Sequence, residues 1–264
     1  MAGGMKLLAR AAVVFVAMVA LYLLVGVAAW LVPDAPVRRH VERSLYIGDL
    51  HEDYPKAILF DDLNVQDRTT LDNFTDALVV NQAVNLRSRG MRGILLLPRY
   101  QEKGASMGHN LERSLAGAEE GDVWFYSRYW HGSTFVVRIL LSVMDMLGIR
   151  YLLYVLSSLL MLWLAARLWR HVGKAVCVSL CFALLMVNVY VMQFSVQFAP
   201  VLLIALGAAL WLTFRRTPTA EESGLLFFVV GSLTTYFDLI TVPTLTLGIP
   251  LVVWIAANGR AEGG

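Results

Sequence analysis

Long apolar runs separated by short polar connections dominate the chain, and this pattern predicts a bundle of membrane-spanning helices. The runs lie at about 7–32, 149–169, 175–192, 198–214, 224–240 and 243–257. Several runs are only 15–18 residues long, so we expect their ends to lie in the interfacial region or the spans to be little tilted. The pattern therefore predicts six spans.

The N-terminal run follows two basic residues, Lys6 and Arg10, and extends to Val32. The apolar core of a cleaved signal peptide has about 7–15 residues, whereas this run is long enough to cross a bilayer. We therefore expect an uncleaved anchor. The small residues at 27–29 leave cleavage as the alternative.

The segment 133–148 is also apolar, and its placement decides the topology of everything that follows it. If it crossed the membrane, the basic loops 167–174 and 214–217 would both lie outside, against the positive-inside rule. If it does not cross, both loops and Arg260 lie in the cytoplasm together with the basic N-terminus. The charge pattern therefore predicts that this segment stays on the outer side.

One polar stripe runs along the same segment. Thr134, Arg138, Ser142 and Asp145 recur at steps of 4, 4 and 3, which places them on one face of a helix. Such a helix is expected to rest at the membrane interface, with a bend at 148–150 where the chain enters the membrane. The alternative is a span whose stripe faces a polar interior, where each central charge costs about 2.5–3.5 kcal/mol.

These patterns predict an all-α integral membrane protein. We expect a transmembrane anchor at 1–32, an extracytoplasmic loop region with amphipathic or interfacial helices at 33–148, and a helical bundle at 149–264. Because the chain stops soon after its sixth apolar run, we expect it to be either a fragment of a larger protein or a shortened gene product.

Composition agrees with this class of protein. Hydrophobic residues make up 58% of the chain and charged residues 16%, and the mean hydropathy is +0.61. The net charge is only +2 and there is no basic block, which argues against a nucleic-acid partner. Cys177 and Cys181 lie four apart in an apolar run and are expected to be small buried hydrophobes rather than redox or metal groups.

Candidate acids for chemistry lie in the predicted outer region. The stretch 69–84 predicts a helix, with Thr69 or Thr70 as N-cap and with Asp72 and Asp76 on one face. Upstream, Asp61 and Asp62 lie near a loop. The alternatives are solvated residues on the helix face for the first pair and an ordinary turn for the second.

Other polar residues are predicted to reach the same side of the membrane. They are Arg128, His131, Gln193, Gln197 and Asp238, which could form a polar site at the outer boundary with the acids. Alternatively, Arg128 belongs to an interfacial belt of aromatic and cationic residues, and His131 caps the next helix. Asp238 lies in an apolar setting and needs a partner or water.

Such a set of groups suits the transfer of a sugar from a lipid-phosphate donor to an acceptor hydroxyl. A carboxylate can deprotonate the acceptor hydroxyl, and a cation can stabilise the phosphate leaving group as charge develops on it. Aromatic faces suit sugar rings. Many membrane proteins contain these groups, so the residues alone do not select this chemistry.

Three segments carry a resemblance to a known class: "LDNFTDALVVNQAV", "YSRYWHG" and "TTYFDLITVPTLTLGIPL". They resemble segments of large bacterial polytopic membrane proteins whose layout is similar to that of GT-C glycosyltransferases. The resemblance implies a multi-pass protein of the bacterial cytoplasmic membrane with its N-terminus in the cytoplasm. It also implies that the protein moves a sugar from a polyprenyl-phosphate donor to an envelope acceptor on the outer face.

The resemblance also implies roles for residues. Asp72 or Asp76 would be the catalytic base, with Asp61 and Asp62 as second choice. Arg128 and His131 would contact phosphate or sugar. Asp238 would help to shape the side of the site that holds the acceptor or a metal ion. No cofactor is certain, but a divalent metal ion is possible, with unknown ligands.

The chain departs from the class in two ways, because Asp72 lies farther from the first span than is usual and six spans are few. The competing interpretation is a non-catalytic membrane subunit or carrier for an envelope lipid, polysaccharide or small solute. No internal repeat or matched pair of broken spans supports a secondary transporter. A structural partner without chemistry is the third alternative.

Overall fold

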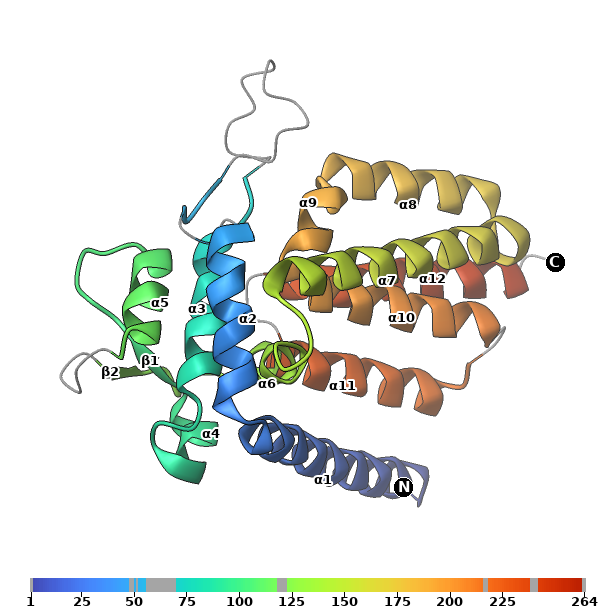
Figure 1. The fold of residues 1–264 in the computed structure, drawn as a ribbon. Helices are drawn as coiled ribbons and strands as arrows, with labels where there is room; N and C mark the ends of the chain where they lie inside the picture. Colours follow the sequence, from blue (N-terminus) through green and yellow to red (C-terminus); the bar gives the residue numbers. More distant parts are fainter. Residues whose placement is uncertain are drawn as a thin grey trace, which may run out of the picture.

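The computed structural model describes residues 2–47, 50, 52–55, 70–117, 123–215, 218–237 and 242–262. These residues form twelve α-helices, two short strands and almost nothing else that is regular, which confirms the all-α prediction. Figure 1 shows two regions: a set of long helices that lie side by side, and a set of shorter helices that run roughly across them at one end.

The long helices form the region that we call the bundle. They are α1 (Ala2–Leu31), α7 (Met146–Arg167), α8 (Lys174–Met186), α10 (Phe198–Phe214), α11 (Ala220–Phe237) and α12 (Pro243–Glu262). Successive members run in opposite directions, so the segment 168–173, the end of α10 and the start of α11 lie at the end of the bundle where α1 begins (Figure 1). Helix α10 is apolar on all faces and packs between α7 and α12, as expected for a central helix.

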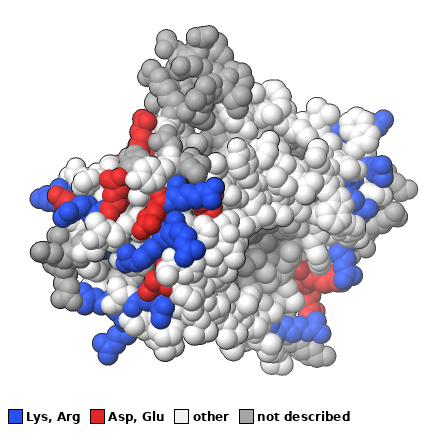
Figure 2. Space-filling view, in the orientation of Figure 1, with Lys and Arg blue, Asp and Glu red and all other residues white. Residues whose placement is uncertain are grey.

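Two bundle helices are long and apolar enough to cross a membrane, namely Leu7–Leu31 and Met146–Val172. Three further helices are apolar but shorter: Lys174–Met186, Phe198–Phe214 and Pro243–Gly259. The distribution of charge on the surface is consistent with such helices. Charged side chains gather over the end region and at the far end of the bundle, and the surface between them is largely uncharged (Figure 2). Large side chains such as Val16, Leu162 and Phe182 are exposed there.

The shorter elements, residues 34–140, form what we call the end region. They are α2 (Asp34–Ile47), α3 (Asn73–Asn85), a 3₁₀ turn (Gly90–Arg92), α4 (Gly93–Leu96), β1 (Pro98–Tyr100), α5 (Met107–Leu115), β2 (Val123–Phe125) and α6 (Gly132–Leu140). The strands are antiparallel, with Arg99 opposite Trp124. Helix α3 is the core of this region, since almost all of its side chains are buried. A π-helical turn (Leu168–Val172) and α9 (Val189–Phe194) flank α8 in the bundle.

The start of α3 differs from the prediction. Its N-cap is Asp72, whose carboxylate accepts hydrogen bonds from the Thr75 backbone N–H at 3.0 Å and from the Thr75 hydroxyl at 2.8 Å. The predicted cap at Thr69 or Thr70 is therefore wrong. Residue 69 lies outside the described part of the chain, and the residues before the cap are held extended because the Leu71 N–H donates to the Pro55 carbonyl.

The segment 133–148 is not one helix, so the predicted interfacial helix with a four-residue stripe is wrong. Helix α6 ends at Leu140, and Asp145 is the N-cap of α7, accepting a hydrogen bond from the Gly148 N–H at 2.9 Å. The predicted bend at 148–150 therefore lies inside α7. The first half of the stripe faces the protein interior, because α1 and α3 pack against α6.

The buried side chain of Arg138 connects several helices in that interior. Its guanidinium is fully buried and donates to the carbonyl oxygens of Ala29, Val32 and Ala83, and it forms an ion pair with Asp34. Two of these acceptors, Ala29 and Val32, lie at the C-terminal end of α1, where a helix leaves carbonyl groups available for side-chain donors. The side chain thus ties α6 to α1, α2 and α3, and this junction fixes the end region on the bundle.

Candidate functional site

The acid Asp76 lies in the first turn of α3 and is fully buried. Its carboxylate accepts hydrogen bonds from Arg150 Nη2 at 2.8 Å and Nε at 3.2 Å, and from the Val196 N–H at 3.0 Å. Burial raises the pKa of the Asp76 carboxyl, and the Arg150 guanidinium opposes that rise by stabilising the charged form. These contacts join α3 to α7 and to the segment between α9 and α10.

The second acid of this helix, Asp72, is half-buried and occupied as the α3 N-cap. The structure therefore brings Asp72 and Asp76 to the same end of α3, as predicted, but both carboxylates already have structural partners. Their catalytic assignment stays a prediction. Asp61, Asp62 and Asp238 lie outside the described residues.

A second group of predicted residues lines a pocket of about 350 Å³ between α4, the 127–130 turn, α6 and α11. We call it the aromatic pocket; it is lined by Ile94, Leu95, Leu97, Ser127, Arg128, Tyr129, Trp130, His131, Phe135 and Thr235. Arg128 is exposed at this pocket, with its guanidinium carbon 5.3 Å from the centre of the Tyr129 ring. The described residues include no acid in ion-pair contact with Arg128.

His131 lies at the start of α6, and only 3% of it is exposed. Burial lowers the pKa of the His131 imidazole to about 4, and the nearby Arg99 charge acts in the same direction, so the ring is neutral at pH 7. A hydrogen bond to the Tyr126 backbone opposes the shift, because it stabilises the protonated ring. Among the described residues, His131 Nε2 has no hydrogen-bond partner.

The tautomer of His131 follows from these contacts. A ring nitrogen that bonds to the Tyr126 carbonyl must carry a proton, and Nε2 is the unpartnered nitrogen, so Nδ1 is the donor. In the neutral ring Nε2 is then an acceptor. A ligand hydroxyl that reaches it would donate a hydrogen bond.

His131 also borders a small inner cavity of about 10 Å³, lined by Thr75, Val79, His131, Ser133, Gln197 and Phe237. This volume holds about one water molecule. Thr75, which lines this cavity together with His131, donates a hydrogen bond to Asp72. His131 therefore lines both the aromatic pocket and a cavity that includes Thr75, the hydrogen-bond partner of Asp72.

Close packing fixes the backbone beside His131. A Cβ added to Gly132 would lie 2.4 Å from Cδ1 of Tyr236, so only glycine fits there without movement. The Tyr236 ring stacks on Tyr22 at a centroid distance of 3.9 Å, and Trp130 lies 5.9 Å from Tyr22 and 6.1 Å from Tyr236. This cluster holds the start of α6 against α1 and α11.

Two residues of the junction, Arg138 and Arg150, were not predicted to bind other residues. The sequence did contain a signal for these contacts, because each arginine lies within or near the start of an apolar helix. A charged group that is buried in such a setting requires a partner. The described residues contain no group of three or more His, Cys, Asp or Glu side chains that could hold a metal ion.

Comparison of the chain with protein-family models, with curated proteins and with solved structures gives no match.

Proposed function

We propose that the six bundle helices cross a bacterial cytoplasmic membrane, with the N-terminus in the cytoplasm and the end region outside. The alternating helix directions support this topology, as does the uncharged surface around the bundle (Figures 1 and 2). Basic residues also gather at one end of the bundle: Arg10, Arg167, Arg170, Lys174 and Arg215.

On this topology, the protein is a GT-C-like glycosyltransferase that moves a sugar from a polyprenyl-phosphate donor to an envelope acceptor. The aromatic pocket binds the phosphate and the first sugar, because it combines an exposed cation with aromatic side chains at the junction of the two regions. The observation that carries the proposal is the buried, unpartnered Nε2 of His131, a residue that lines the same pocket.

The transfer step follows from these groups. The acceptor hydroxyl attacks the sugar carbon that carries the phosphate, and the bond from that carbon to the phosphate oxygen breaks. Arg128 stabilises the negative charge that develops on the departing phosphate. The hydroxyl proton passes to His131 Nε2, whose basicity rises when an anionic phosphate lies beside it.

Purified full-length protein in vesicles, supplied with polyprenyl-phosphate sugars, tests this proposal. We expect His131→Gln to lower kcat about 100-fold or more, because a general base is lost. Arg128→Gln should raise KM. Arg89→Gln, which removes an exposed cation near Phe125 outside the pocket, should change neither and is the matched control.

Asp72→Asn distinguishes the two candidate bases, since asparagine is also a good N-cap and preserves the start of α3. Little loss of activity in Asp72→Asn with a large loss in His131→Gln would support the histidine. The reverse result would overturn its role and return it to the acid. Absence of polyprenyl-phosphate release from every donor would overturn the proposed transfer.

One observation favours a second candidate, a non-catalytic subunit that binds the same lipid-linked sugar. Both described acids of α3 are engaged, one as an N-cap and one in a buried ion pair. Saturable binding of the donor by the wild type, weakened by Arg128→Gln but without release of polyprenyl phosphate, would support this candidate.

A further inference from the structure

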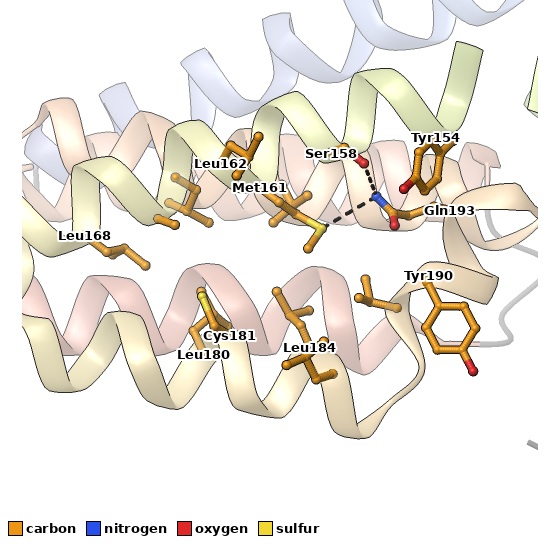
Figure 3. A pocket seen from close by; sticks show the side chains of 15 residues that line it. Tyr154, Ser158, Met161, Leu162, Leu168, Leu180, Cys181, Leu184, Tyr190 and Gln193 are labelled. Atoms are coloured by element: carbon orange, nitrogen blue, oxygen red, sulfur yellow. Dashed lines mark hydrogen bonds between the residues drawn. The ribbon is translucent and has the colours of Figure 1, made fainter. Parts of the chain in front are cut away.

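A groove of about 360 Å³ lies between α7 and α8 (Figure 3), and it shares no lining residue with the aromatic pocket. Helix α8 packs mainly at its two ends, against the π-helical turn and against α9. Cys177 and Leu184 are its only buried residues. The middle of α8 therefore stands apart from α7, and the groove is the space between them.

The polarity of the groove changes along its length. Most of its wall is apolar, with Leu162, Leu168, Leu180 and Leu184 along the helices (Figure 3). At the α9 end, Gln193 Nε2 donates to Ser157 Oγ at 3.0 Å and to Ser158 Oγ at 2.9 Å.

The polar end of the groove is uncharged. Tyr154 and Tyr190 also lie there, whereas none of the described lining residues is an acid, an arginine, a lysine or a histidine. The groove thus fits an amphiphile whose polar group has no net charge.

The size of the groove selects a chain rather than a helix. The lining extends from Tyr154 on α7 to Leu168 at its end, a span of about 21 Å, so a volume of 360 Å³ corresponds to a mean cross-section of about 17 Å². A helix with its side chains is about 10 Å wide, which requires about 80 Å². Leu162 and Leu185 line the groove and are 69% and 61% exposed, so the groove is continuous with the apolar outer surface of the bundle.

We propose that this groove binds one hydrocarbon chain of an outer-leaflet lipid with an uncharged polar group, such as a glycerol ester, beside Gln193. The assignment to the outer leaflet depends on the topology proposed above. The lipid-binding proposal does not depend on the proposed glycosyl transfer. The chain replaces the contacts that α7 and α8 lack in the middle of the groove. The described lining residues offer a phosphate no charged partner, which disfavours a phosphate at the Gln193 end.

Photo-crosslinking tests this assignment. Full-length protein is placed in phosphatidylcholine vesicles that contain a monoacylglycerol with a diazirine on its chain, without any sugar donor. We expect crosslinks at Leu184, which faces the groove and is 6% exposed. Leu247 and Val252 on α12 are exposed outside the groove and report ordinary contact with the bilayer.

Two variants fill the groove from opposite walls, Ala165→Phe on α7 and Cys181→Phe on α8. Each should abolish the Leu184 crosslink and retain those at Leu247 and Val252. Retention of the α12 crosslinks shows that the variant is folded and inserted, so each variant gives a result independently of the other.

A lysophosphatidic acid probe, which has the same single chain and a phosphate in place of the uncharged group, tests the polar group. We expect about tenfold less crosslinking at Leu184 than with the uncharged lipid. Equal labelling by the two probes would overturn the uncharged-group assignment. No crosslink at Leu184, or one that both filling variants leave unchanged, would overturn the groove as a chain site, whatever the outcome of the sugar-transfer assay.

Discussion

The end region and the bundle are opposite in construction. The interior of the end region contains the buried charged groups Asp76 and Arg138, and its surface is rich in charge; the partner of Asp76, Arg150, lies near the start of the bundle helix α7. The bundle core is made of leucine, alanine and valine, with hydroxyl and amide groups such as Ser157 and Gln193 as its buried polar members. Its surface is largely uncharged (Figure 2).

This difference separates two ways of stabilising a fold. A buried ion pair tolerates no loss of one partner, because the charge that remains is costly in the interior. Apolar helix packing spreads its contribution over many small contacts, so a single polar group contributes little. Substitutions should therefore be costly in the end region and mild in the bundle.

The largest effect is expected for the Asp76–Arg150 pair. Asp76→Ala removes the carboxylate that pairs with Arg150, and we expect the free energy of unfolding to fall by about 3–5 kcal/mol. Unfolding by SDS in mixed micelles measures this change. The double variant Asp76→Leu, Arg150→Met should recover most of the loss. A fall of less than about 1 kcal/mol in Asp76→Ala would show that the end region does not depend on its buried charges.

The second effect concerns pH. The folded protein lowers the pKa of His131 from 6.5 to about 4, so below pH 6.5 the unfolded chain binds more protons than the folded one. Stability should therefore fall as the pH falls from 6.5 to 4, by about 3 kcal/mol in total. The difference in the free energy of unfolding between the wild type and His131→Gln, measured from pH 6.5 to pH 4, isolates the contribution of His131. Parallel pH profiles of the two proteins would contradict it.

The helices of the bundle were largely predictable from the sequence, because long apolar runs directly mark apolar helices. The run 198–214 coincides with α10, and the run 243–257 lies within α12. The prediction of a single helix over 175–192 was wrong. The helix is interrupted at Asn188, which adopts a left-handed conformation with φ of 52°. Asparagine tolerates that conformation better than most residues, so Asn188 was the available signal.

The candidate site was less predictable. The sequence indicated that Thr134 and Arg138 share a helix face, but a periodic pattern does not reveal what covers that face. The partners of Arg138 come from three other helices, and Arg150 is 74 residues from Asp76. Such long-range pairs depend on the tertiary fold, so one sequence without its fold cannot identify them.

A matched pair of glycine substitutions should change stability in opposite directions in the two regions. A Cβ at Gly132 collides with the Tyr236 ring, so Gly132→Ala should destabilise the protein by about 1–3 kcal/mol. Gly207 lies within α10 and nothing lies within 4 Å of an added Cβ, so Gly207→Ala should stabilise it by up to about 1 kcal/mol. SDS unfolding compares both variants, and a loss of stability in both would contradict the contrast.

The smallest effect is expected inside the bundle, at Ser157. Its hydroxyl accepts a hydrogen bond from Gln193 Nε2, but Ser158 accepts from the same nitrogen, so Ser157→Ala leaves Gln193 with a partner. The hydroxyl also donates to the Leu153 carbonyl at 2.7 Å, an oxygen that a helix already satisfies through its backbone. Hydrogen bonds between membrane helices average about 0.6 kcal/mol, and we expect a loss of that size on SDS unfolding. A loss above about 2 kcal/mol would mean that the bundle, like the end region, depends on individual polar contacts.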